Sequence, residues 1–289
     1  MARRAGTGAV VALAIALVDG ALAVAAPAGA GEPVVGGESS DPGEYPATGA
    51  LVRGVSYRCT ATLIAPDVAI TAAHCLVDEG FGDFSFTLDP DLNDDLDGLV
   101  PVIAFHQHPY FHSEGDFNEL AQRNDLGVFI LERPIESIAP ESLGDMADNL
   151  SLTSGSEMQL CGYGRDTWAD TSSDGVKRDA LVHVDMMTPW ELQSADEDPQ
   201  PCRGDSGGPV FVETAGGRRI AGVVSRAVGG ERMCSTGAIY TRVAPYLAWV
   251  ETASLDRDMG GCSATRGSGC PWLALLGSLA LVGRRRARR

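Results

Sequence analysis

The sequence has few basic residues for its number of acidic ones. Residues 34–262 contain 14 Lys and Arg against 37 Asp and Glu. Because so acidic a surface repels phosphate groups, this balance argues against a nucleic-acid-binding protein. An internal repeat with the period of helical repeat proteins is also missing. A region of about 230 residues without such repeats is long enough for one domain with a full core, and its length is usual for a double β-barrel.

Long apolar runs are missing as well, because none reaches the ~20 residues that a membrane-spanning helix needs. Two shorter runs lie near the ends of the sequence. Residues 9–18 follow Arg3 and Arg4 and precede sites made of small residues. We therefore expect residues 1–30 to be an export signal and residues 31–33 to be a short pro-segment.

The second run, residues 271–283, follows a linker rich in Gly, Ser and Cys at 257–270 and precedes a cluster of arginines. This order of cysteine, short apolar helix and arginine cluster resembles the C-terminal sorting tails of myxobacterial surface proteins. The resemblance implies that sorting machinery recognises residues 271–289, cuts the chain near Cys262 and attaches the protein to a membrane. Cys270 is a second candidate for this cysteine. The expected location is the cell surface or outer membrane, with release into the medium as the alternative.

The region between the ends has a mostly β pattern. Short apolar and β-branched runs are separated by turns rich in Gly, Pro and Asp. Only residues 244–253, with bulky side chains at helical spacing, predict a helix. Many short strands and one terminal helix indicate a barrel or a sandwich. The predicted strands are 59–65, 68–71, 126–132, 180–187, 219–225 and 238–243.

Three motifs far apart in the sequence contain the residue types of nucleophilic catalysis. A serine hydroxyl is a poor nucleophile near neutral pH, so it needs a base and a third group that orients the base. His74 lies in TAAHC, directly after a predicted strand, and Asp125 begins DLGVFIL. Ser206 lies in GDSGGP, a stretch with too many glycines for an ordinary strand.

These motifs and their order resemble the trypsin/chymotrypsin-like serine endopeptidases. The similarity begins at VVGGESSDPGEYPATGALV (34–52), includes CGYGR (161–165) and ends at YTRVAPYLAWV (240–250). The resemblance implies an all-β fold over residues 34–256, with two six-stranded antiparallel β-barrels and a C-terminal helix. It also implies a monomeric enzyme that hydrolyses peptide bonds in protein or peptide substrates.

The resemblance implies catalytic roles for individual residues. His74 would be the general base and acid, Asp125 the carboxylate that orients it, and Ser206 the nucleophile. The amides of Gly204 and Ser206 would form an oxyanion hole, in which one donor is worth roughly 3–4 kcal/mol. We expect a side chain at position 204 to obstruct the approach of the substrate to this hole.

Activation would depend on Asp205, which in the family pairs with the α-amino group released by zymogen cleavage. In this sequence that amino group would belong to Val34. Because Pro33 precedes Val34, the sequence leaves open which protease or trimming step activates the protein.

The substrate pocket follows from the same alignment. Gln200 would form its floor, and Ser225, Ala227 and Gly237 would belong to its walls. An aspartate on the floor would imply cleavage after Lys or Arg, whereas Gln200 does not. Arg226 occupies a position where the family usually has tryptophan. The acidic residues that precede Gln200 leave a basic preference possible.

The cysteines fit the same family. The resemblance implies the disulfides Cys59–Cys75 and Cys202–Cys234, which would need an oxidising compartment. Cys161 lacks its usual partner because Val212 stands where that cysteine is expected, so we predict that Cys161 is a buried thiol.

No cofactor is expected, although two segments leave a metal open. Residues 89–98 are rich in acids that could bind calcium, but they lack the terminal glutamate of an EF-hand loop. His106, His108 and His112 could bind zinc, yet no acidic helix motif accompanies them, so we assign no metal.

A second class of function also fits the sequence. A protease-like binding or adhesion module at the cell surface could keep the fold and lose turnover. The complete set of catalytic residues favours the enzyme.

Overall fold

The computed structural model describes residues 38–41, 43–54, 56–77, 84–93, 98–112, 119–167, 174–230, 234 and 236–257. The chain divides into two units, residues 1–30 and 31–289, and every described residue belongs to the second unit. The expected export signal, Pro33, Val34, Cys262, Cys270 and the tail lie outside the described residues. Among the described residues, no helix is both long and apolar enough to cross a membrane.

The first half of this unit is a closed β-barrel. Its strands follow one another around the barrel in the order β2, β3, β4, β7, β6 and β5, and every pair is antiparallel. The strands are β2 (Thr48–Arg53), β3 (Ser56–Ala65), β4 (Val68–Thr71), β5 (Phe84–Thr87), β6 (Val100–Gln107) and β7 (Gly127–Leu131).

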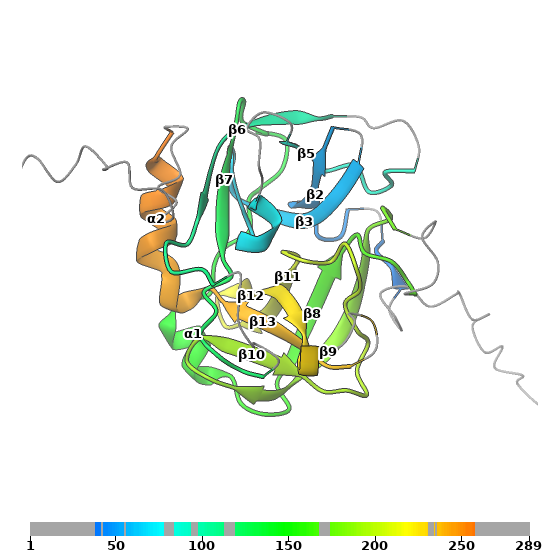
Figure 1. Ribbon diagram of the computed structural model, residues 1–289, viewed down its shortest axis with the longest axis vertical. Helices are drawn as coiled ribbons and strands as arrows, with labels where there is room; N and C mark the ends of the chain where they lie inside the picture. The colour runs from blue at the N-terminus through cyan, green and yellow to red at the C-terminus, as the bar shows by residue number, and fades with distance from the viewer. Residues whose placement is uncertain are drawn as a thin grey trace, which may run out of the picture. The chain divides into compact units, whose positions relative to one another are not determined.

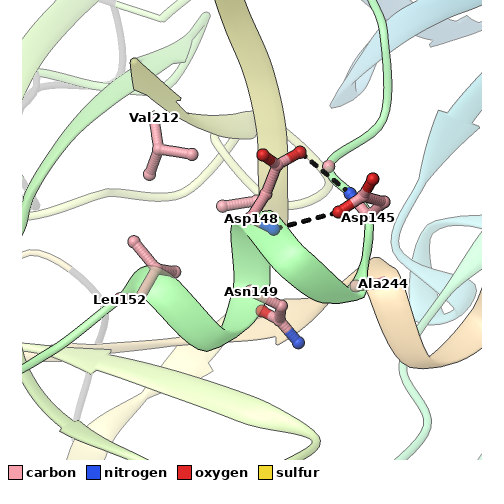
Figure 2. Close-up of a pocket in the computed structure, with 8 residues that line it drawn as sticks. Asp145, Asp148, Asn149, Leu152, Val212 and Ala244 are labelled. Atoms are coloured by element: carbon pink, nitrogen blue, oxygen red, sulfur yellow. Dashed lines mark hydrogen bonds between the residues drawn. The ribbon is translucent and has the colours of Figure 1, made fainter. Parts of the chain in front are cut away.

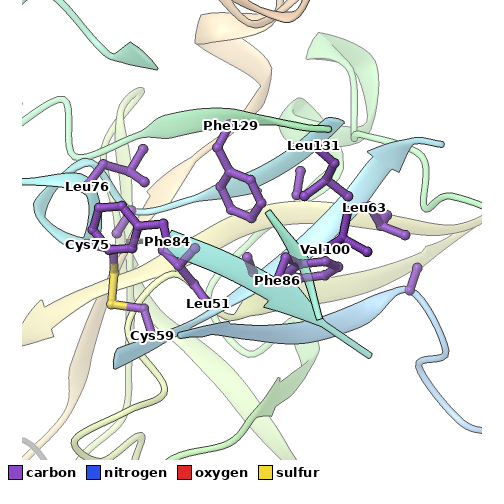
Figure 3. Packing of buried hydrophobic residues seen from close by; sticks show 14 residues of the cluster. Leu51, Cys59, Leu63, Cys75, Leu76, Phe84, Phe86, Val100, Phe129 and Leu131 are labelled. Carbon is purple, nitrogen blue, oxygen red and sulfur yellow. A yellow bond between two sulfur atoms is a disulfide. The ribbon is translucent and has the colours of Figure 1, made fainter. Parts of the chain in front are cut away.

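Apolar side chains and one disulfide fill this first barrel (Figure 3). Phe86 and Phe129 face each other with ring centroids 5.6 Å apart, as aromatic pairs in cores commonly do. Cys59 on β3 is bonded to Cys75 at the edge of the same core. Large buried rings and a covalent link therefore fix the strands that lead to residues 73–76.

The second half is also a closed barrel, in which β8 pairs with both β9 and β11. The strand order is β9, β10, β13, β12, β11 and β8, and the short β1 (Glu38–Ser39) adds to β9. The strands are β8 (Glu157–Gly162), β9 (Arg178–Met187), β10 (Glu191–Ser194), β11 (Pro209–Thr214), β12 (Gly217–Ala227) and β13 (Ala238–Arg242). The predicted fold of two six-stranded barrels with a C-terminal helix is confirmed.

The C-terminal helix α2 (Leu247–Leu255) joins the two barrels. The chain leaves β13 in the second barrel, forms a 3₁₀ turn at Ala244–Tyr246 and continues as α2. Figure 1 shows α2 (orange) beside β7 of the first barrel, which it contacts. Val250 and Ala253 of α2 belong to a buried cluster that contains side chains of both barrels.

A second, short helix, α1 (Met146–Ser151), was not predicted. Its N-terminus is closed by a reciprocal pair of carboxylates, shown in Figure 2. The Asp145 side chain accepts from the Asp148 amide at 2.9 Å, and the Asp148 side chain accepts from the Asp145 amide at 3.1 Å. Two otherwise unpaired backbone donors are satisfied in this way, which stabilises a helix too short to persist by itself.

Candidate active site

The His74 side chain is held by Asp125 at the junction of the two barrels. His74 lies in the 3₁₀ turn Ala73–Leu76, directly after β4, and Asp125 lies just before β7, the strand that pairs with β4. The His74 amide donates to Asp125 Oδ1 at 2.9 Å, and His74 Nδ1 donates to Oδ2 at 2.8 Å. Because an ionised carboxylate only accepts, the Nδ1 proton is fixed and Nε2 is left as an acceptor.

Asp125 is fully buried, yet it remains ionised. Burial alone would raise its pKa, but His74, the nearby Arg123 and a hydrogen bond from Ser225 outweigh burial and lower the pKa to about 2. Ser225 Oγ donates to Asp125 Oδ2 at 2.6 Å, and Arg123 Nη1 lies 3.6 Å from the same oxygen. The charge of Asp125 is therefore available to stabilise a protonated His74.

Asn124 explains how the backbone presents Asp125. Its φ is +57°, a left-handed conformation that asparagine tolerates better than most residues. Its side chain donates to the carbonyl of Tyr110 at 2.8 Å and accepts from the Tyr246 hydroxyl at 2.9 Å. The first barrel and the C-terminal turn thus fix the residue before Asp125.

Ser206 lies on the other side of His74. The Cys75 Sγ atom is 3.6 Å from the Ser206 carbonyl oxygen and 3.8 Å from His74 Nε2. The Ser206 carbonyl oxygen and His74 Nε2 therefore lie next to the same sulfur atom. The Ser206 carbonyl also accepts from the Thr60 amide at 2.9 Å. Ser206 and His74 are both half-buried. Both lie within the described part of the chain, in which no hydrogen bond joins Ser206 Oγ to His74 Nε2.

The glycines around Ser206 are required by close packing of the loop. Gly204 has φ +109°, and a Cβ there would lie 2.5 Å from the Tyr57 ring and 2.9 Å from the Gly164 Cα. The Gly204 carbonyl accepts hydrogen bonds from the Tyr57 hydroxyl and from Thr60 Oγ1. A side chain at position 204 would therefore collide first with the protein itself.

The backbone amides proposed for the oxyanion hole have no carbonyl acceptor within the described part of the chain. The neighbouring amides do have one, because Asp205 donates to the Cys202 carbonyl at 3.0 Å and Gly207 to the Val224 carbonyl at 2.8 Å. Gly204 and Ser206 therefore keep their N–H groups for another acceptor, as an oxyanion hole requires.

Asp205 is buried behind this loop. Its carboxylate accepts from the Gly164 amide at 2.7 Å and from the Cys202 amide at 2.8 Å. Burial raises its pKa to about 6, although these two donors and the charge of Arg178 act in the opposite direction. Val34, its expected partner, lies outside the described residues.

Two of the predicted pocket residues, Gln200 and Gly237, both bond to Asp196 in the loop that precedes Gln200. The Gln200 amide group donates to the carbonyls of Ala195, Asp196 and Asp198 at 3.0, 3.3 and 2.7 Å. Gly237 donates to the Asp196 carboxylate at 2.9 Å.

The other two predicted wall residues, Ser225 and Ala227, lie on β12. Ala227 pairs with Ala238, the neighbour of Gly237, whereas Ser225 two residues earlier is bonded to Asp125. Ser225 therefore contacts the His74–Asp125 pair directly.

The predicted pattern of cysteines is confirmed. The structure contains the disulfides Cys59–Cys75 and Cys202–Cys234, and Cys161 is a buried free thiol. Val212, where a partner for Cys161 was expected, is buried in the second barrel and faces Leu152 in Figure 2. Burial raises the pKa of the Cys161 thiol well above its usual value, so the thiol is uncharged.

The structure separates the three histidines that were considered as zinc ligands. His108 and His112 line a cavity of about 420 Å³, but His106 contacts the Asp256 carbonyl at 2.7 Å. The three histidines therefore form no cluster. The one group of metal-type ligands among the described residues is His74 with Cys59 and Cys75, whose sulfurs are bonded to each other.

The acidic segment 89–98 is described only in part. Asp91 accepts from the amide and side chain of Asn93, and Asp89 accepts from the amide of Asp91. Residues 94–97 lie outside the described part, so the calcium alternative at this segment is untested.

Glu191 and its pairing with Arg226 were missed by the sequence analysis. Glu191 on β10 and Arg226 on β12 form an ion pair with 2.8 Å between Oε2 and Nη2. Neither lies in a motif, and the only signal in the sequence was the arginine at a position usually occupied by tryptophan.

Two closed barrels with a histidine at their junction that is bonded to a buried aspartate define the class of chymotrypsin-like proteins. The model of the Trypsin family matches residues 34–250, and the chain belongs to this family.

Curated relatives are distant. A trypsin of Saccharopolyspora erythraea is 28% identical over 237 residues, which cover 74% of this chain and 94% of the relative. The suppressor of tumorigenicity 14 protein homolog of Bos taurus is 28% identical over 245 residues, which cover 75% of this chain but only 28% of that protein. The relatives support a serine protease in general terms.

Solved structures agree on the fold. A mutant of human heparin binding protein has a TM-score of 0.66 and 22% identity, with 78% of this chain and 99% of that chain covered. The secreted serine protease VesC from Vibrio cholerae has a TM-score of 0.60 and 22% identity, with 75% of this chain and 47% of that chain covered.

Proposed function

We propose that the protein is a serine endopeptidase in which Ser206 is the nucleophile. The observation that carries this proposal is the double attachment of His74 to Asp125, which leaves Nε2 free to accept a proton on the side of Ser206. A carboxylate that holds the Nδ1 proton of a histidine keeps the ring in the tautomer whose Nε2 can take the proton of a serine hydroxyl.

The reaction divides between these groups. Ser206 Oγ bonds to the carbonyl carbon of the peptide while its proton moves to His74 Nε2. The carbonyl oxygen becomes negative and accepts hydrogen bonds from the amides of Gly204 and Ser206. His74 then gives the proton to the leaving amine as the peptide bond breaks, and water removes the acyl group by the same steps in reverse order.

We further propose export and display. The two disulfides are stable in an oxidising compartment, which agrees with the export signal expected at residues 1–30. Residues 271–289 would direct the protein to the cell surface through Cys262. Cleavage before Val34 would activate it by supplying a partner for Asp205.

Hydrolysis by purified protein tests the enzymatic proposal. The parent, cut before Val34, should digest casein, whereas Ser206→Ala and His74→Ala in the same form should each lose nearly all activity. The double variant should lose little more because the groups act as one unit. Equal activity of the parent and Ser206→Ala would refute the assignment.

A catalytically silent surface-binding module is the second candidate. The specific observation in its favour is that Ser206 Oγ, in a fully described loop, has no hydrogen bond to His74. Hydrogen bonds of this kind are often formed only in complex with substrate. A parent protein that hydrolyses no casein or peptide substrate would favour the binding module.

A further inference from the structure

The buried carboxylate of Glu191 connects two segments of the chain that both contact Asp125, namely β12 and residues 121–125. Glu191 is only 1% exposed. Its Oε1 accepts from Arg226 Nη1 at 2.9 Å, and its Oε2 accepts from Arg226 Nη2 at 2.8 Å. The same carboxylate also accepts from the amides of Ala121 at 2.7 Å and Arg123 at 3.4 Å. Glu191 therefore links β10 to β12 and to the segment that ends at Asp125.

Both of these segments contact Asp125. Arg226 Nη1 lies 3.4 Å from the Oγ of its neighbour Ser225, and that oxygen donates to Asp125 at 2.6 Å. Arg123, whose amide binds Glu191, has its own guanidinium 3.6 Å from the Asp125 carboxylate. A change at Glu191 thus reaches Asp125 by two routes.

Among the described residues, the charged and titratable groups around this network can be named. Arg226 from β12, Arg123 from the segment before β7 and Tyr246 from the C-terminal turn face Glu191. Asp125 is surrounded by His74, Arg123 and the Ser225 hydroxyl. Glu191 balances the charge of Arg226, and the Arg123 guanidinium lies 3.6 Å from the Asp125 carboxylate.

We propose that Glu191 is a positioning residue for the reaction and that its pairing with Arg226 sets the charge balance around the His74–Asp125 pair. The inference rests on the proposed function of that pair. The carboxylate holds Ser225 and Arg123 in contact with Asp125, and Asp125 in turn holds His74.

Substitution of Glu191 and substitution of Arg226 should change the protonation of His74 in opposite directions. Glu191→Gln removes the negative charge that compensates Arg226, which is connected to Asp125 by two hydrogen bonds through Ser225. The uncompensated positive charge disfavours a protonated His74. Arg226→Gln leaves the negative Glu191 uncompensated, which favours a protonated His74. The acid limb of the kcat/KM profile should therefore move to lower pH in the first variant and to higher pH in the second, by a few tenths of a pH unit.

A matched control separates this effect from loss of stability. Glu141 and Arg218 form another partly buried ion pair, in which Arg218 packs on the rings of Tyr45 and Phe211. Within the described residues, no hydrogen bond or ion pair joins this pair to Asp125. Glu141→Gln should lower the free energy of unfolding as a broken ion pair does, but it should leave the acid limb of the profile at its parental pH.

The experiment measures kcat, KM and the kcat/KM profile of the protein cut before Val34 and of the three variants in the same form, with a peptide substrate. Glu191→Gln should lower kcat roughly tenfold with little change in KM, because the reacting groups are displaced. Acid limbs that shift in the same direction, or that do not shift, would overturn the proposal, as would an equal shift in Glu141→Gln.

A readout without turnover distinguishes failure of this inference from failure of the proposed function. The NMR signals of the His74 ring protons change as the ring titrates, whether or not the protein cleaves peptides. The midpoint of that change should move in the same opposite directions in Glu191→Gln and Arg226→Gln. An inactive parent that shows these shifts would refute the peptidase and keep the network, whereas an active parent without them would refute the network alone.

Discussion

Asp125 binds His74 at two points, the backbone amide and the ring nitrogen Nδ1, with distances of 2.9 and 2.8 Å. The first contact fixes the turn that carries the histidine, and the second fixes the tautomer of its ring. The two contacts need two acceptor oxygens, which a carboxylate has and a carboxamide lacks.

Asp125→Asn should therefore separate positioning from folding. The amide can accept at only one atom, so the His74 ring should take the wrong tautomer and kcat should fall by roughly four orders of magnitude, the size known for this substitution in such a triad. Circular dichroism should show an unchanged fold. A variant that keeps more than a tenth of the parental kcat would contradict this role of Asp125.

Gly204→Ala should destabilise the protein because of a collision and not only because of its backbone conformation. The new Cβ would lie 2.5 Å from the Tyr57 ring, at a φ of +109°. We expect a loss of about 2–3 kcal/mol in the free energy of unfolding, measured by denaturant titration.

Gly217→Ala is the matched control for this variant, since Gly217 has φ +93° but open space around the position of a Cβ. It should cost only the backbone strain of about 1 kcal/mol. Equal losses in both variants would show that the contact with Tyr57 has no effect.

Asp205 should make stability depend on pH in protein that has not been cut before Val34. Its folded pKa is raised from 3.8 to about 6, so the folded state holds the proton more tightly than the unfolded chain. The stabilising contribution is complete below pH 3.8 and is lost as the pH rises through about 6. This shift corresponds to about 3 kcal/mol.

The free energy of unfolding of this form should accordingly fall relative to that of Asp205→Asn between pH 4 and pH 7. Denaturant titrations across this range provide the measurement. Protein that begins at Val34 should not show this fall, because its α-ammonium group would pair with Asp205. A difference between parent and variant that is independent of pH in both forms would contradict the assignment.

The tail is expected to sort the protein and not to contribute to catalysis. The second barrel and α2 end by Leu255, so deletion of residues 262–289 should release active enzyme into the medium. Cys262→Ser should impair processing and surface retention at unchanged kcat. Fractionation of cells that express tagged variants measures both. An inactive truncated protein, or normal retention of Cys262→Ser, would contradict the sorting role.

Local patterns predicted several strands and the C-terminal helix, whereas the arrangement in two six-stranded barrels was implied by the resemblance to a known family. The strand predicted at 68–71 is β4, and the predicted strand 180–187 lies within β9 (Arg178–Met187). β10 (Glu191–Ser194) was missed because three of its four residues are polar, and its burial depends on partners from distant strands. α1 was missed because its stability comes from the Asp145–Asp148 cap and not from a periodic apolar pattern.

The same distinction applies to the candidate site. The resemblance carried by the motifs and cysteines implied the pairing of His74 with Asp125 and both disulfides. The Glu191–Arg226 pair could not be predicted, because 35 positions separate the two residues and only the folded second barrel brings them together. The collision expected at position 204 was assigned to the substrate, whereas the structure places the Tyr57 ring there.

The most direct test of the central claim is covalent labelling of Ser206 with a fluorophosphonate, which reacts with serines that an adjacent base activates. Protein that begins at Val34 should acquire one adduct, and mass spectrometry of its peptides should place the adduct on Ser206. His74→Ala, with an intact Ser206, should remain unlabelled. An unlabelled parent, or equal labelling of the parent and His74→Ala, would contradict the account.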